Sequence, residues 1–280
     1  MRRRSLPRRA AAGALAVLAI VAILGATAFA RVRPTNAHVY RAEEAVLPEI
    51  AFHGHEVAIR HVRNFAFRPG AQPVPGYYDR TYDLDKVVRV WFVLSPFAKL
   101  WRGPAHSFVS FELADLQFVA ISVEARKEPG EEYSPALGLL KRYELMYVVA
   151  DERDVIGLRA VAWGDPVYVY PGRATPAQAR ALFVHMLRRA QSLGSRPEFY
   201  DTLDNNCTTN IEDAINLIAP GRARNGIEGV LPGYADQAAL EDGLLDTDLP
   251  IEAARRRFRV NERARAAAGA ADFSLRIRQR

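Results

Sequence analysis

The first pattern along the chain is an apolar run at residues 10–30. It contains no charged residue over 21 positions. As a helix rising about 1.5 Å per residue, it is long enough to cross the roughly 30 Å hydrocarbon core of a bilayer. Five arginines lie within residues 1–9, and basic flanks of this kind stay in the cytoplasm. We therefore expect an uncleaved signal anchor, favoured over a cleaved signal peptide although AFA at 28–30 is similar to a cleavage site.

No second apolar run of this length follows, so the exported remainder is expected to be soluble. The segment at 31–48 is polar and contains proline, which is typical of a linker. We expect the chain to consist of a basic cytoplasmic segment at 1–9, the anchor at 10–30, this linker, one folded domain at 49–275 and a short tail at 276–280.

The first half of the domain has the alternation and the β-branched and aromatic residues of strands. These patterns predict strands at 55–67, 86–97, 105–113, 116–126, 142–150 and 166–172. The strongest signal is the pair AHSFVSFEL and LQFVAISVEAR, which a short turn near Ala114–Asp115 joins into a hairpin. A Gly-, Pro- and Tyr-rich loop is expected at 68–83. DERD at 151–154 is interpreted as a solvated charged turn rather than a metal site.

Beyond residue 174 the pattern becomes helical. A helix is predicted from Thr175, which is a cap residue followed by proline, to Gly194. A second helix is predicted at 207–218, where Pro220–Gly221 ends it. Further helical stretches are expected at 233–243 and 250–267. Strands followed by helices indicate an α+β fold, with one antiparallel sheet and helices packed against it.

Charge excludes one large class of partners. The formal net charge is +6, but basic residues are concentrated at the two ends, and nine arginines fall in the last 30 residues. The middle of the chain is close to neutral and has no basic stripe interleaved with aromatic residues, so nucleic-acid binding is not expected. The sequence also predicts no cofactor and no metal site, because its histidines lack partners at ligand spacing.

Cys207 is the only cysteine among the 280 residues. A single thiol cannot form an intramolecular disulfide, so export to an oxidising compartment gives it no structural role. Buried cysteines often act as small hydrophobic residues. Here, however, Asn206 or Thr209 is a suitable cap for the predicted helix, which places Cys207 within its first turn. Because the N-terminus of a helix favours negative charge, this position favours a reactive thiolate.

A nucleophilic cysteine needs a base, and His106 is the strongest candidate because it opens the predicted hairpin at a sheet end. A histidine bonded to backbone at a strand start is the alternative. If Leu113 pairs near Gln117, His106 lies opposite Glu124, which then orients the imidazole; another loop length places Ser122 or Glu124 diagonally. The alternative for Glu124 is an exposed ion pair with Arg126.

Several motifs occur in the order found in one family. They are HSFVSFEL, ISVEAR, YELMYVVADERDVI, NNCTTNIEDAI and LPGYADQAALEDGLLDTDLPIEAAR. Through them the chain resembles the Lnb N-terminal periplasmic domain family over about 55–275. That family is similar to NlpC-type and lecithin:retinol acyltransferase-like cysteine enzymes with a permuted papain-like fold. In the permuted enzymes a histidine on the first strand of a hairpin and a polar residue on the second precede the cysteine, and His106, Glu124 and Cys207 have this order.

The resemblance implies a bacterial inner-membrane protein with a single span and a periplasmic domain. It implies a thiol enzyme that forms an acyl-cysteine on a phospholipid or lipoprotein substrate. The Lnb proteins add C-terminal transmembrane helices, which are not found in this sequence. A cell-wall cysteine peptidase or amidase, and a binding module without catalysis, are the alternatives. The further candidates for substrate or oxyanion contact are Asn206, Arg63, Asn64, Tyr82 and Arg126.

Overall fold

The computed structural model describes residues 8–67, 73–98, 100–224 and 226–279. The chain divides into two compact units, Met1–Thr35 and Asn36–Arg280. The first contains helix α1 (Arg8–Arg31), and its stretch Gly13–Arg31 has a mean hydropathy of 2.4 and is long and apolar enough to cross a membrane. No other helix in the described ranges meets both conditions. The single N-terminal apolar helix expected from the sequence is therefore confirmed.

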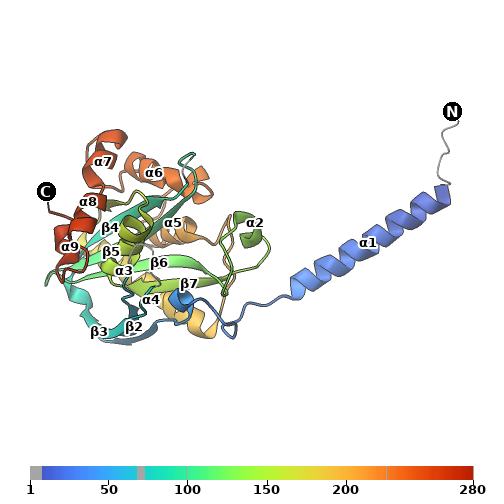
Figure 1. Ribbon diagram of the computed structural model, residues 1–280, viewed down its shortest axis with the longest axis horizontal. Helices are drawn as coiled ribbons and strands as arrows, with labels where there is room; N and C mark the ends of the chain where they lie inside the picture. Colours follow the sequence, from blue (N-terminus) through green and yellow to red (C-terminus); the bar gives the residue numbers. More distant parts are fainter. Residues whose placement is uncertain (1–7, 68–72, 99, 225, 280) are drawn as a thin grey trace. The chain divides into compact units, whose positions relative to one another are not determined.

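The second unit is built on one sheet (Figure 1). Its strand order is β1-β2-β7-β6-β5-β4-β8, and β3 pairs with β2 outside this order. The strands are β1 Glu49–His53, β2 Glu56–Arg63, β3 Tyr77–Asp83, β4 Val87–Pro96, β5 Ala105–Leu113, β6 Phe118–Arg126, β7 Glu144–Ala150 and β8 Tyr168–Pro171. Most neighbouring strands are antiparallel, but β2 and β7 run parallel. The α+β class is confirmed, and the expectation of a purely antiparallel sheet is wrong.

The helices of the second unit are α2 Pro135–Gly138, α3 Glu152–Gly157, α4 Pro176–Ser195, α5 Cys207–Ile218, α6 Ala235–Glu241, α7 Ile251–Phe258, α8 Asn261–Ala266 and α9 Phe273–Arg276. Helices α2 and α3 lie between strands in the chain, and the helices from α4 onward follow the last strand. A π-helical turn, Leu158–Trp163, continues α3. The α4 and α5 helices confirm two sequence predictions. The helix expected at 250–267 is interrupted, because Arg259 leaves the helical conformation and forms a β-bridge with Tyr168.

Two apolar layers fill the space on either side of the sheet, because side chains alternate along each strand. On one face, Val109, Phe111 and Ile121 pack with the buried stripe of α4 and with α5, which includes Cys207. On the other face, Phe108 and Ala120 pack with α3, α8 and α9. We refer to these as the α4/α5 layer and the α3/α8/α9 layer.

Three strands form a separate part of the sheet, which we call the ribbon (β1, β2 and β3). It meets the remaining strands through the pair Arg63 and Ala150. The sequence missed β1 and placed β3 in a loop, so the loop predicted at 68–83 is wrong for 77–83. Two neighbouring tyrosines and a bulge in β2 hide the alternation of β3, although Tyr82 faces the core and is fully buried.

The acidic segment at 151–154 is not the solvated turn that its sequence suggests. Asp151 caps α3 by accepting a hydrogen bond from Arg153 N–H, but Glu152 and Asp154 are fully buried. Distant arginines neutralise both of these carboxylates, and such partners cannot be recognised locally in a sequence. Within the described ranges, no group of three or more His, Cys, Asp or Glu side chains is arranged to hold a metal ion.

Candidate functional site

Cys207 is the first residue of α5, and the helix is capped immediately before it. Asn206 Oδ1 accepts hydrogen bonds from Thr208 N–H at 2.9 Å and Thr209 N–H at 3.1 Å. Thr209 Oγ1 accepts in turn from Asn206 N–H at 2.9 Å, which completes a capping box. Of the two caps that the sequence allowed, Asn206 is the one used. The Cys207 thiol therefore lies at the positive end of a 12-residue helix.

His106 lies near the start of β5, and the hairpin has the register that brings Glu124 opposite it. Leu113 N–H donates to Gln117 O at 2.9 Å, and Phe108 pairs with Ser122. His106 Nε2 is 3.1 Å from Glu124 Oε1. His106 and Glu124 thus have the geometry expected for one of the two loop lengths considered. Glu124 does not pair with Arg126, so the exposed ion pair considered as an alternative is not formed.

A serine bridges the histidine and the carboxylate. Ser122 Oγ is 2.7 Å from His106 Nε2 and donates to Glu124 Oε1 at 2.8 Å. Because Ser122 uses its proton on Glu124, its oxygen is the acceptor for the Nε2–H of His106. The nitrogen left for the thiol is then Nδ1, in the unprotonated form that can accept a proton.

Arg159, on the π-helical turn, completes the charge arrangement. Its Nη2 is 3.4 Å from Glu124 Oε1, and its guanidinium lies over the Trp163 ring. Burial disfavours ionised Glu124, but the charges of His106 and Arg159 hold its pKa well below the ordinary value. Burial likewise opposes protonation of His106, and the Glu124 charge offsets this so that the pKa of His106 is raised.

The thiol is poised to ionise near neutral pH. Burial raises the pKa of Cys207, but interaction with His106 and hydrogen bonding from Ser107 lower it to about 7. Thr208 Oγ1 is 3.9 Å from Cys207 Sγ and 3.0 Å from Ser107 Oγ. Cys207 is 4% exposed and His106 is 8% exposed, so the thiolate and imidazole interact in a poorly solvated space.

The two principal groups come from opposite sides of the sheet. Alternation along β5 directs Ser107 toward Thr208 of the α4/α5 layer, whereas His106 contacts Ser122 and Phe108 on the α3/α8/α9 side. Cys207 belongs to the α4/α5 layer and meets His106 near the start of β5. The candidate site therefore lies at the end of the sheet, where both layers contribute.

The side-chain amide of Asn206 was predicted as a possible donor to the oxyanion, but its hydrogen bonds are structural. Its Nδ2 donates to Thr202 O at 2.9 Å and to Gly229 O at 2.8 Å, while its Oδ1 caps α5. The amide is therefore fully used and is not available to an oxyanion. The cap engages the N–H groups of Thr208 and Thr209 and does not include the Cys207 N–H, which is the better candidate for this role.

The other four residues predicted to contact a substrate or oxyanion take part in interactions that stabilise the fold. Arg63 forms a buried ion pair with Asp154 at 2.7 Å. Arg126 donates to the carbonyls of Glu44 and Ala45 and stacks over the Tyr40 ring. Asn64 pairs with Gly76 through its backbone N–H. Tyr82 is fully buried, with its ring edge-on to Phe183. In the described part of the chain, none of these four side chains forms a hydrogen bond or an ion pair with Cys207 or His106.

Arg159, Ser107 and Thr208 are site residues that sequence reasoning missed. Ser107 directly follows His106 and Thr208 directly follows Cys207 in the sequence. Their position next to a predicted site residue was a signal that could have identified them. Arg159 carries no such signal, because the π-helical turn after α3 sets its direction and local spacing does not predict that turn.

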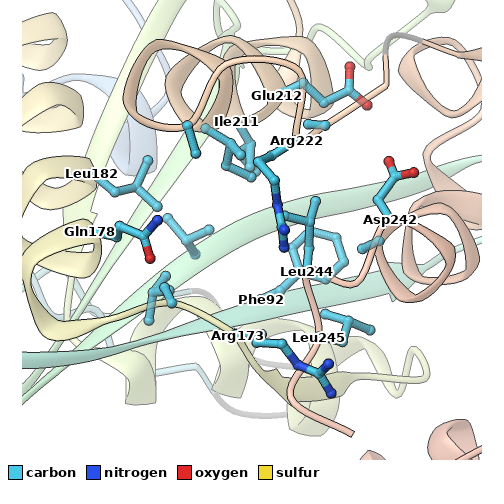
Figure 2. A pocket seen from close by; sticks show the side chains of 18 of the residues that line it. Phe92, Arg173, Gln178, Leu182, Ile211, Glu212, Arg222, Asp242, Leu244 and Leu245 are labelled. Atoms are coloured by element: carbon cyan, nitrogen blue, oxygen red, sulfur yellow. The ribbon is translucent and has the colours of Figure 1, made fainter. Parts of the chain in front are cut away.

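A cavity of about 750 Å³ with both apolar and charged walls has Thr208, the neighbour of Cys207, among its lining residues (Figure 2). Its walls come from β4, α4, α5 and the segments 219–224 and 228–246, and its lining includes Thr208 but neither Cys207 nor His106. Thr208 thus separates the cavity from the thiol by one side chain. The apolar lining is formed by Val90, Phe92, Val109, Leu182, Ile211, Ile215, Leu244 and Leu245.

The thiol's pKa gives a test that requires no substrate. Alkylation of Cys207 by iodoacetamide should rise with pH around a midpoint of about 7. His106→Ala should raise this midpoint by more than one unit, which slows alkylation at pH 7 by roughly fivefold or more. His185→Ala, on the partly exposed side of α4, is the matched control. An unchanged midpoint in His106→Ala would contradict the assigned interaction.

Comparison with known families gives one match. The model described as the Lnb N-terminal periplasmic domain matches residues 74–233, which is more than half of the chain. The matched range includes β5, β6 and α5, and with them His106, Glu124 and Cys207. Neither the curated proteins nor the solved structures contain a match to the chain.

Proposed function

Since the chain belongs to the Lnb N-terminal periplasmic domain family, we propose that it is a thiol enzyme of the periplasm that forms an acyl-cysteine on Cys207. The family and the apolar helix α1 fit a single-pass protein of the inner membrane. The observation that carries the proposal is the connected set Cys207, His106, Ser122 and Glu124, with a thiol whose pKa is lowered to about 7.

The reaction begins with proton transfer from the Cys207 thiol to His106 Nδ1. The thiolate attacks an ester or amide carbonyl, and the Cys207 N–H donates to the oxyanion that develops. When the intermediate collapses, the carbon–oxygen or carbon–nitrogen bond breaks and His106 returns its proton to the leaving group. Ser122 and Glu124 hold the imidazole orientation, while Arg159 keeps Glu124 ionised. An amine or water then takes the acyl group and restores the thiol.

A lipid or lipoprotein is the substrate that the surroundings favour. The cavity beside Thr208 has an aliphatic and aromatic part that suits an acyl chain, and charged side chains on its walls that suit a polar head group. The membrane-spanning candidate α1 belongs to the same chain, so acyl lipids are available at high local concentration. A permuted papain-like arrangement is consistent with this order of groups and forms part of the proposal.

Mass spectrometry tests this directly. The full chain in detergent micelles is incubated with a phospholipid of defined acyl chains, or with a diacylated lipopeptide, and then digested. We expect the Cys207 peptide to gain one acyl chain in place of a hydrogen, through a bond that neutral hydroxylamine cleaves. Cys207→Ala should show no such product. Acylation that persists in Cys207→Ala would overturn the proposal, and cleavage of a cell-wall peptide without acylation by lipid would favour the peptidase alternative.

A further inference from the structure

Four connecting segments surround the start of α5, and we call them together the rim. They are the β4–β5 connection, the β6–β7 connection with α2, the turn before α5 and the stretch 226–234. Thr202, in the turn before α5, donates from Oγ1 to Pro135 O of α2 at 2.8 Å. Asn206 Nδ2, one residue before the thiol, donates to Gly229 O at 2.8 Å. These bonds bring three of the four segments together around the first turn of α5.

The fourth segment, between β4 and β5, joins the rim through the stretch 226–234. Gly233 N–H donates to Gly103 O at 2.9 Å, and Arg102 Nε donates to Gly233 O at 2.6 Å. The Trp101 ring lies over the Gly103 backbone, where a Cβ would be only 2.0 Å from the ring. The rim is therefore one connected surface at the end of the sheet where β5 begins.

The rim carries a concentration of exposed apolar side chains. Most of the large apolar side chains that are exposed in the described part of the second unit lie on it. Each of its four segments contributes, since Leu100 is 97% exposed, Leu140 60%, Leu203 54% and Ile227 68%. Folded domains rarely leave so much apolar surface in one place unless it binds a protein or a membrane.

The chain enters the second unit at the same end of the sheet. Asn36, the first residue of that unit, accepts a hydrogen bond at Oδ1 from Arg126 Nη1 at 2.9 Å, and Arg126 ends β6 two residues after Glu124. Residues 32–35 connect Asn36 to Arg31, where α1 ends, and four extended residues span at most about 14 Å. Because α1 is the membrane-spanning candidate, this short connection ties the rim end of the sheet to a bilayer surface.

We propose that the rim docks on the surface of the phospholipid bilayer that α1 spans, with its apolar side chains inserted at the level of the head groups and the upper acyl chains. Leucine gains there from leaving water, and tryptophan prefers this interface. The inference rests on the proposed function only in placing α1 in a membrane, and it requires no chemistry at Cys207. Docking holds the start of α5, and with it the thiol, against the layer that contains acyl lipids.

The charged side chains of the rim favour an apolar contact over an electrostatic one. Arg102 is bound by Asp236 at 2.6 Å, and Arg142 is bound by Glu131. Because these arginines are neutralised by carboxylates of the same domain, they have little charge left to attract anionic lipids. The rim should therefore dock on vesicles of phosphatidylcholine, which carry no net charge.

Fluorescent labels in the full chain test the docking. The background is Cys207→Ala, which contains no other cysteine. Leu140→Cys and Leu116→Cys are each introduced into it, labelled with the polarity-sensitive dye NBD and reconstituted in phosphatidylcholine vesicles. Leu116 is the matched control because it is 59% exposed and lies in the turn at the far end of β5, a strand of nine residues that spans about 30 Å.

We expect lipids that carry a nitroxide near the head group to quench the label at position 140 and not the label at position 116. Quenching by aqueous iodide should be weaker at 140 than at 116 by roughly threefold or more. Leu100→Asp, on another segment of the rim, should reduce the lipid quenching at 140 by roughly half or more, because the rim inserts as one surface.

Equal quenching by iodide at positions 140 and 116 would overturn the inference. Shielding of position 140 from iodide without quenching by the nitroxide lipid would also overturn it, because a second protein molecule would then cover the rim. The labelled proteins lack the thiol, so their result does not depend on acyl transfer. Failure of the acyl-cysteine proposal and failure of this inference are therefore distinguishable.

Discussion

Replacing His106 with alanine is expected to slow acylation of Cys207 by roughly 10²–10⁴-fold at pH 7, the range that general bases contribute. Two effects combine. The thiol loses the imidazole interaction that lowers its pKa to about 7, and the leaving group loses its proton donor. Only the hydrogen bonding from Ser107 then opposes burial, so the pKa of Cys207 rises and more of the thiol stays protonated at pH 7. The initial rate of acyl-peptide formation, measured by mass spectrometry with a phospholipid in excess, gives the ratio.

The pH profile separates this mechanism from a merely disturbed fold. In His106→Ala the remaining acylation should increase with pH well beyond 7, since hydroxide replaces the base in forming the thiolate. The wild-type rate should level off above a midpoint of about 7. His185→Ala should match the wild type in both rate and profile. Acylation of His106→Ala at the wild-type rate would remove His106 from the mechanism.

The second large effect concerns stability. Asp154→Asn is expected to lower the free energy of unfolding by about 3–5 kcal/mol, the cost of leaving one member of a buried ion pair unpaired. Asp154 Oδ1 is 2.7 Å from Arg63 Nη2, and its Oδ2 accepts from Phe65 N–H at 2.8 Å. The Asp154 side chain is 0% exposed and that of Arg63 is 6% exposed. Asparagine keeps the size of aspartate but leaves the buried guanidinium without a counter-charge.

Urea unfolding followed by circular dichroism measures this loss. Glu49→Gln is the control, because it removes an ion pair with Arg60 at 3.2 Å whose side chains are 59% and 68% exposed. Such exposed pairs contribute about 0–1 kcal/mol. If Asp154→Asn cost no more than Glu49→Gln, the Arg63–Asp154 pair would not be a significant source of stability.

Local sequence signals predicted the core of the candidate site. The hairpin at β5 and β6 alternates regularly and turns over few residues, so its register could be proposed and with it the approach of Glu124 to His106. Cap-type residues around Cys207 identified the start of α5 and the position of the thiol, although the sequence left Asn206 and Thr209 open as the cap and did not predict the capping box that these two residues form. Both signals depend on neighbouring residues alone.

The parts that could not be predicted depend on residues far apart in the chain. Arg63 was considered a substrate contact because it is charged and next to Asn64, yet Asp154, 91 positions later, binds it. Arg159 reaches Glu124 across 35 positions, through a π-helical turn with no clear sequence signal. Residues 36–48 have the composition of a linker, but Tyr40 and Glu44 are buried in the second unit. Such pairings emerge only when the layers are assembled.

The origin of Cys207 and His106 in different layers has a consequence for export. In the unfolded chain the thiol has neither the cap of α5 nor the imidazole, so it keeps its ordinary pKa and is largely unreactive at neutral pH. Because His106 belongs to β5, the thiol meets the imidazole only when α5 has packed against the sheet. The pKa of Cys207 is therefore lowered only after this packing, so a chain that is still unfolded during export has a less reactive thiol.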